Sequence, residues 1–258
     1  MKRTSSLLIM LMLMLVSFTA GVEFQRGDVD QDGKVSISDV TVLINYLLTN
    51  QWPTDEPDYE WVDLGLPSGT LWATCNVGAN SPEDYGEYFA WGETAPKGTY
   101  YWSNYKWCKG SYTTLTKYCT VAVYGYNEFV DNKTELDPQD DAAYVNCGPL
   151  WRTPTKAQID ELRDKCTWLW TTQNGVNGGL VTGPNGASLF LPAAGERWYN
   201  ILDDGVGSGG YYWSRTVTAA DPYNAYPIHF DRTGNTSGNG SVSRIIAHTV
   251  RPVRVSQY

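Results

Sequence analysis

The chain has 258 residues, of which 18% are charged, and its formal net charge is −9 with a pI near 4.7. An acidic balance argues against nucleic-acid binding and against docking on anionic lipid, because both need basic surface. Plentiful glycine and aromatic residues favour a protein of strands and loops over a helical bundle.

Residues 1–21 have the pattern of a secretory signal peptide. The positive start MKR precedes an apolar run and the small residues TAG, with cleavage expected near Ala20 or Gly21. The apolar run from Leu7 to Val22 is shorter than the roughly 20 residues that a membrane helix needs. We therefore expect an exported protein, secreted or at the cell surface, with no membrane span in the mature chain.

The stretch GDVDQDGKVSISD, residues 27–39, predicts a calcium-binding loop. Oxygen ligands in such loops come from alternating positions, with a glycine at the sharp turn, and Gly33 takes that place. A solvated acidic turn is the alternative interpretation. The predicted calcium ligands are Asp28, Asp30, Asp32, Lys34 through its carbonyl, Ser36 through a water molecule, and Asp39.

A helix is expected directly after this loop, because apolar residues recur at helical spacing from Val40 to Leu48. Sensor proteins place glutamate where this loop has Asp39. The pattern GDVDQDGKVSISDVTVLINYLL resembles a type I dockerin repeat over residues 27–49. The resemblance implies calcium as cofactor and a cohesin-like partner. Dockerins typically carry two repeats, and one short helix must pack on the following domain, a partner or a second copy.

Residues 50–58 are rich in proline and acidic side chains and predict a linker, so that a second domain covers residues 59–258. It opens with a predicted hairpin, YEWVDLGL and TLWATCNV around the turn PSG. Two helices are expected. One would be capped by Asp137, and the other by Thr155 in a capping box with Gln158.

Several long motifs of this second domain carry a family resemblance. They are VDLGLPSGTLWATCNVGA, PEDYGEYFAWGET, WRTPTKAQIDEL, WLWTTQNGVNG, VTGPNGASLFLPAAG, GYYWS and VRPVR. Over residues 59–254 the chain resembles the Fibrobacter succinogenes major domain, found in exported proteins of gut and rumen bacteria. The resemblance implies an α+β, C-type-lectin-like fold with twisted antiparallel strands, two short helices and long loops. It also implies that the terminal strands pair, with TVRPVRV beside WVDLGL.

Recognisable catalytic motifs are nearly absent. GVGSGG matches a dinucleotide-binding pattern by its letters, but it leads into a predicted strand and therefore indicates a turn. His229 and His248 stand alone on predicted strands, and the adjacent pairs Asp140–Asp141 and Asp203–Asp204 cannot face each other as a carboxylate dyad. We predict a protein that is not an enzyme.

Tryptophan and cysteine leave alternatives open. Eleven tryptophans could stack on sugar rings or build the core. The core is expected to hold Trp61, Trp72, Trp91, Trp151 and Trp213, whereas Trp102, Trp107 and Trp198 are candidates for exposure. Five cysteines leave at least one unpaired. Cys108 and Cys119 are close enough in sequence to close a loop, and buried free thiols are the alternative.

The ligand face is expected in residues 213–249, ahead of the final strand, where bacterial variable proteins with this type of fold build theirs. An ordinary exposed hairpin is the alternative. The function predicted is an exported, non-catalytic ligand-binding or adhesion protein whose extracellular ligand is a glycan or a surface protein. The alternatives are a polysaccharide-degrading, glycoside-hydrolase-associated protein and a purely structural cell-surface component. The candidate ligand-binding residues are Tyr226, His229, Asp231, Arg232, Arg244 and His248.

Overall fold

The structure, a computed structural model, describes residues 59–199, 201–234, 236–238 and 240–255, together with Val40 and Leu43. Contacts between Cα atoms divide the chain into two units, residues 1–55 and 56–258. The predicted signal peptide, calcium ligands and linker lie outside the described residues. Neither helix of the second unit, as described, has the length or the apolar run needed to cross a membrane.

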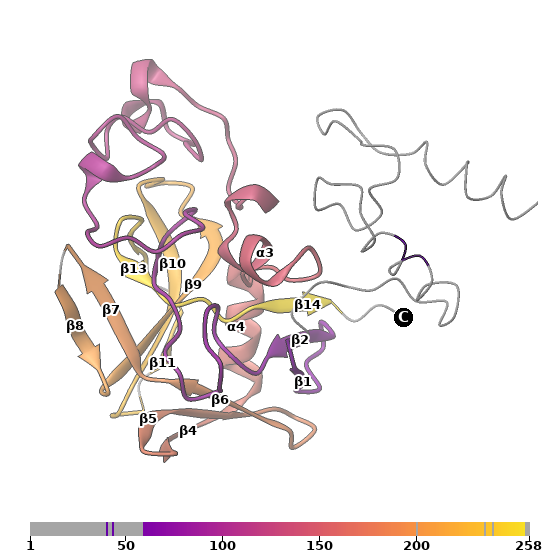
Figure 1. Cartoon of the computed structure of the whole chain (residues 1–258). Helices are drawn as coiled ribbons and strands as arrows, with labels where there is room; N and C mark the ends of the chain where they lie inside the picture. The colour runs from indigo at the N-terminus through magenta and orange to yellow at the C-terminus, as the bar shows by residue number, and fades with distance from the viewer. Residues whose placement is uncertain are drawn as a thin grey trace, which may run out of the picture. The chain divides into compact units, whose positions relative to one another are not determined.

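The second unit is a mixed α and β domain in which strands dominate and form three sheets (Figure 1). Its two described α-helices are α3 (Ala142–Cys147) and α4 (Lys156–Lys165). The strands are β1 (Trp61–Asp63), β2 (Thr70–Ala73), β3 (Phe89–Ala90), β4 (Thr167–Gln173), β5 (Val176–Thr182), β6 (Ser188–Pro192), β7 (Ala194–Trp198), β8 (Ile201–Val206), β9 (Gly209–Val217), β10 (Asn224–Asp231), β11 (Thr236–Ser237), β12 (Val242–Ser243), β13 (Ala247–His248) and β14 (Val253–Val255).

The smallest sheet contains the start and the end of the domain, in the order β1–β2–β14. The predicted hairpin of β1 and β2 is confirmed, with Val62 opposite Trp72. The predicted partner of the last strand was wrong by one place, because β14 pairs with β2 and not with β1. The physical reason is burial. All four residues of β2 are buried, so β2 takes the centre, whereas β1 is largely exposed and suits an edge.

The largest sheet runs β11–β10–β9–β7–β13–β3, with β12 on β10 and β8 on β7. The GVGSGG motif forms the turn between β8 and β9, as predicted, with Gly207 at φ 74°. The long strands β9 and β10 form the middle of the domain in Figure 1. Gly210 on β9 leaves room for the ring of Phe230 on β10, because a Cβ atom there would lie within 2.5 Å of that ring.

Helix α4 begins at Lys156 with the capping box that the sequence predicts. The Thr155 hydroxyl accepts from the Gln158 N–H, and the Gln158 side chain accepts from the Thr155 N–H. Ile159 and Leu162 face the core against Phe230 and the β4–β5–β6 sheet, while Cys166 is half-buried at the end of the helix. The predicted first residue of this helix is therefore confirmed.

The first predicted helix begins later than expected. Asp137 precedes a single 3₁₀ turn that starts at Pro138, and its side chain caps nothing. The α-helix α3 is capped by Asp141, whose carboxylate accepts from the N–H groups of Ala143 and Tyr144. The prediction of Asp137 as the side-chain cap was wrong because its carboxylate pairs with Lys117 and Lys133, whereas that of Asp141 meets the free N–H groups of α3.

Candidate functional site

The six predicted ligand-binding residues do not form one cluster. Tyr226 lies next to a β-bulge in β10, and the Lys156 ammonium of α4 stands 5.2 Å from the centre of its ring. His229 is half-buried and stacks on Tyr211 at 4.5 Å. Asp231 is half-buried and accepts from the Thr233 hydroxyl and N–H. Arg232 is exposed in the turn that follows.

Arg244 is fully buried, contrary to the outward placement expected from the sequence. Its guanidinium donates to the Tyr105 hydroxyl at 2.8 Å and to the carbonyls of Pro222 and Tyr118 at 2.7 and 3.1 Å. The same group lies 4.9 Å from the ring centre of Trp91. This buried guanidinium stabilises the fold, because its hydrogen bonds and its contact with an aromatic ring connect three loops.

His248 is buried as well, so it also lacks the expected outward placement. Its ring stacks on Trp213 at 4.2 Å, and its Nε2 lies 2.8 Å from the Glu196 carboxylate. Burial lowers the pKa of His248, although Glu196 acts in the opposite direction. Burial also lowers the pKa of His229, which shares the Tyr211 ring with His248. Both histidines therefore favour the neutral form, as structural histidines do.

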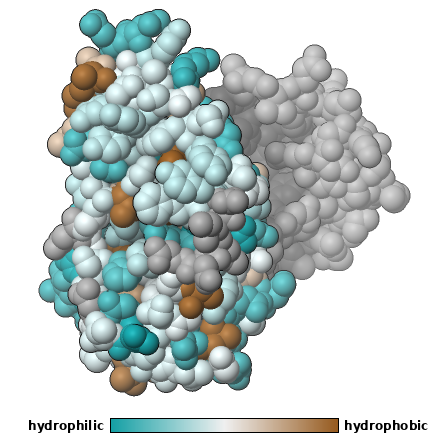
Figure 2. Space-filling model, turned by 90° about the vertical axis from the view of Figure 1, so that its left-hand side faces the viewer, coloured by the Kyte–Doolittle hydropathy of each residue, from teal (hydrophilic) through white to brown (hydrophobic). Residues whose placement is uncertain are grey.

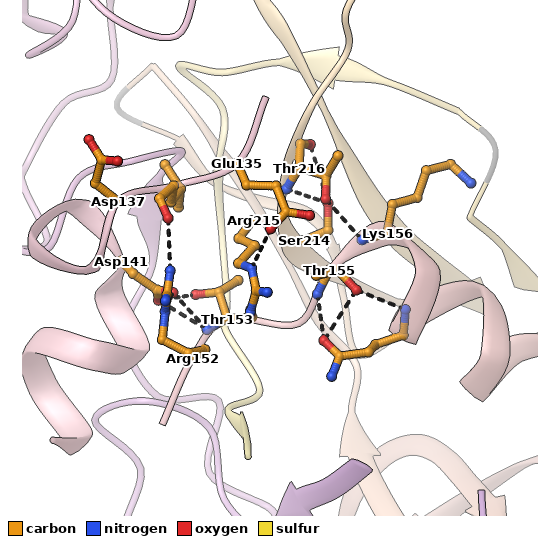
Figure 3. A network of polar contacts seen from close by, with 12 residues as sticks. Glu135, Asp137, Asp141, Arg152, Thr153, Thr155, Lys156, Ser214, Arg215 and Thr216 are labelled. Atoms are coloured by element: carbon orange, nitrogen blue, oxygen red, sulfur yellow. Dashed lines mark hydrogen bonds and ion pairs between the residues drawn. The ribbon is translucent and has the colours of Figure 1, made fainter. Parts of the chain in front are cut away.

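A polar network joins α3, α4 and the end of β9 (Figure 3). The buried carboxylate of Asp141 accepts from Arg152 Nε at 2.7 Å and from the Thr153 N–H and hydroxyl. Nearby, Arg215 pairs with Glu135 at 3.0 Å. Every acceptor of Asp141 in this view meets a donor of the domain itself, so the network holds the chain segments in place.

The adjacent carboxylates Asp140 and Asp141 enter separate networks, as expected for neighbours in sequence. Asp140 is buried and accepts from Lys117 at 2.6 Å, from Tyr118 at 2.7 Å and from Lys106 at 3.2 Å. In the described parts of the chain, no group of three or more His, Cys, Asp or Glu side chains is arranged to hold a metal ion.

The tryptophans divide between core and surface almost as the motifs predict. Trp72, Trp91, Trp151 and Trp213 are buried. Trp61 is 45% exposed, and its assignment to the core was wrong because it lies on the edge strand β1.

Of the three surface candidates, Trp107 is half-buried and its indole N–H donates to Gly92. Two lysines, Lys106 and Lys117, lie 4.3 and 5.0 Å from its ring centre. Trp102 is half-buried, and Trp198 is 45% exposed. Trp198 therefore has the most accessible ring of the three.

None of the five cysteines is joined in a disulfide. Cys108 and Cys119, the pair that could have closed a loop, instead direct their sulfur atoms to backbone carbonyls of Trp102 and Val121. Burial raises the pKa of both thiols. The alternative of buried or half-buried free thiols therefore applies.

Comparison with known proteins places one part of the chain. Residues 26–60 match the dockerin type I domain. This match contains all six predicted calcium ligands, and it ends eleven residues beyond the predicted repeat. A dockerin domain implies calcium binding, a cohesin partner and an extracellular, cellulosome-type component. The C-terminal domain has no family assignment. No curated protein and no solved structure matches the chain.

Proposed function

We propose that the dockerin domain attaches this protein to a cohesin in a calcium-dependent manner and that the large domain is a non-catalytic, C-type-lectin-like module that binds an extracellular ligand. The observation that carries the proposal is the dockerin match at residues 26–60. The matched residues include the loop from Asp28 to Asp39, in which the predicted oxygen ligands have the spacing that a calcium loop requires.

Two features of the large domain support the ligand-binding part. Its first and last strands share one sheet, which closes the scaffold and leaves long loops free to carry a binding surface. The buried ionic groups Asp140, Asp141 and Arg244 are occupied by internal partners that hold these loops. Within segment 213–249, the candidates for ligand contact are the side chains with exposed surface: Tyr226, His229, Asp231 and Arg232.

Calorimetry with a type I cohesin tests the docking part. The full mature chain should bind the cohesin in calcium and lose binding in a chelator. Asp28→Ala should bind calcium and cohesin weakly, because it removes the first carboxylate of the loop. Asp164→Ala is the matched control, since it removes an exposed carboxylate of α4 that lies outside the predicted loop. Equal cohesin affinity of the wild type with and without calcium would overturn the proposal.

A further inference from the structure

The tip of the β7–β8 hairpin carries an aromatic residue in a conformation that aromatic residues rarely adopt. Trp198 pairs with Ile201 across the hairpin, so Tyr199 lies at the tip. The φ of Tyr199 is +59°, in the left-handed region. Tight hairpin turns with positive φ favour asparagine, aspartate or glycine, and a bulky side chain there is strained. Strain of this kind accumulates at functional sites, where the surrounding contacts hold it in place.

Tyr199 is the middle ring of an exposed aromatic stack. Its ring centre lies 5.4 Å from Trp198, with 23° between the planes, and 4.8 Å from Tyr101, with 29°. The three side chains are 45% (Trp198), 40% (Tyr199) and 38% (Tyr101) exposed. We call these three residues the tip stack. Large exposed rings that form one contiguous group indicate an interaction site, whereas single exposed aromatic residues are ordinary on a protein surface.

The backbone holds the tip stack in position before any ligand arrives. The Tyr100 N–H donates to the Tyr199 carbonyl at 2.8 Å and joins the two loops. The Tyr101 N–H donates to the Asn104 side chain at 3.0 Å. Rings that are already ordered lose little conformational entropy on binding, which favours affinity.

A second group of rings follows the tip stack in sequence. Trp102 comes directly after Tyr101 and meets Tyr112 at 6.3 Å between ring centres. Tyr112 in turn meets Tyr223 at 5.3 Å. Figure 2 shows the side of the domain that carries β7 and β8, where residues of near-neutral hydropathy, drawn in pale colours, predominate and hydrophobic residues, drawn in brown, are scattered.

We propose that the tip stack binds the flat faces of β-linked pyranose chains whose hydroxyls are equatorial, such as glucose or xylose polymers. The C–H groups of such a sugar lie on its two faces and pack against the outer faces of Trp198 and Tyr101, because the stack already covers both faces of Tyr199. The sugar hydroxyls point outward and can accept from the tyrosine hydroxyls. The two outer ring faces, on Trp198 and Tyr101, favour a ligand of several sugar units over a single sugar. The absence of formal charge on the three rings favours a neutral glycan. This inference rests on the proposed ligand-binding function of the large domain.

Calorimetry of the full, calcium-loaded chain with cellohexaose, xylohexaose and mannohexaose tests the site. We expect binding of one or both of the first two and weaker binding of mannohexaose, whose axial hydroxyl disturbs the flat face. Trp198→Ala and Tyr101→Ala should each lose about tenfold in affinity, which corresponds to roughly 1.4 kcal/mol. Trp61→Ala is the matched control, because Trp61 is equally exposed but lies on β1 in another sheet.

Tyr199→Asn is expected to weaken ligand binding without lowering thermal stability. Asparagine tolerates positive φ, so this variant should melt at the same or a higher temperature than the wild type. It should nevertheless bind the hexasaccharide about tenfold more weakly, because the ring that holds Trp198 and Tyr101 in one stack is lost. If Tyr199 had only a structural role, its replacement would not weaken binding while keeping the melting temperature at or above that of the wild type.

The outcomes separate this inference from the proposed function. If the wild type binds a hexasaccharide and the Trp198, Tyr101 and Tyr199 variants bind it equally well, the domain binds glycans but the tip stack is not the site. If the wild type binds none of the three hexasaccharides, the tip-stack proposal is overturned. Cohesin binding, measured on the same variants, should not change in any of these cases, and its failure would overturn only the docking proposal.

Discussion

At the scale of single residues, Arg244 stabilises the fold from a buried position, although the sequence predicted it to lie on the ligand-binding surface. Its charge is buried, and its donors satisfy carbonyls of loops that are far apart in the sequence. Sequence reasoning could not detect this burial, because a lone arginine in a loop is usually exposed and its partners Tyr118 and Pro222 come from distant segments.

We predict that Arg244→Ala lowers the free energy of unfolding by roughly 3–5 kcal/mol, because it leaves several buried acceptors unpaired and opens a cavity. Urea denaturation measures the change. Arg232→Ala is the control and should change stability by less than about 0.5 kcal/mol, since Arg232 is exposed. Equal urea midpoints for the two variants would contradict the buried geometry.

The histidines predict a pH dependence with a definite sign. Burial lowers the folded-state pKa of both His229 and His248. Below the unfolded value of about 6.5, the unfolded chain therefore binds more protons than the folded one, and stability falls with decreasing pH. The free energy of unfolding should decline from pH 7.5 to pH 5. His248→Gln should show a shallower decline, and a slope identical to that of the wild type would contradict the assignment.

At the scale of elements, the sequence predicted best where the deciding contacts are local. The capping box of α4 lies within four residues, from Thr155 to Gln158, so the pattern alone located the helix. The pairing of β14 with β2 joins residues 180 or more positions apart, and the choice between β1 and β2 depended on which strand is buried. Burial depends on the assembled core. The alternation of apolar and polar residues in the sequence therefore did not show which of the two strands would be buried.

The cap of α4 gives a prediction at this scale. Thr155→Ala should lower the free energy of unfolding by about 1 kcal/mol, the usual effect of a lost N-cap. Thr155→Ser keeps the hydroxyl that accepts from the Gln158 N–H and should be close to the wild type. The measurement is the urea midpoint of the three proteins. A loss of the same size in both variants would show that packing of the threonine methyl, and not capping, is responsible.

At the scale of the whole molecule, the domain is held together by packing and buried polar contacts without a disulfide. Each of the five cysteines stays outside any disulfide. Cys119 and Cys147 are fully buried, and burial raises the pKa of Cys166 to about 11. Little Cys166 thiolate therefore exists at neutral pH, which slows its oxidation.

We accordingly predict that a reductant leaves the melting temperature unchanged. The unreduced chain should release five reactive thiols when it is unfolded in denaturant, as counted with a chromogenic disulfide reagent. The native protein should react more slowly and incompletely. Fewer than five thiols in the unfolded, unreduced chain would reveal a disulfide.

The small β1–β2–β14 sheet has a geometric consequence for the connectivity of the domain. Val62 and Val253 lie on opposite sides of the same residue, Trp72. Two interstrand spacings, about 10 Å, therefore separate β1 from β14. Both strands run antiparallel to β2 and hence parallel to each other, so a bridge from Val255 to Trp61 must also run back along the length of the sheet. A linker of several residues could make this connection. The chain could then be opened in the exposed turn at Ser208, which would yield a circular permutant with the same core and the same exposed aromatic rings.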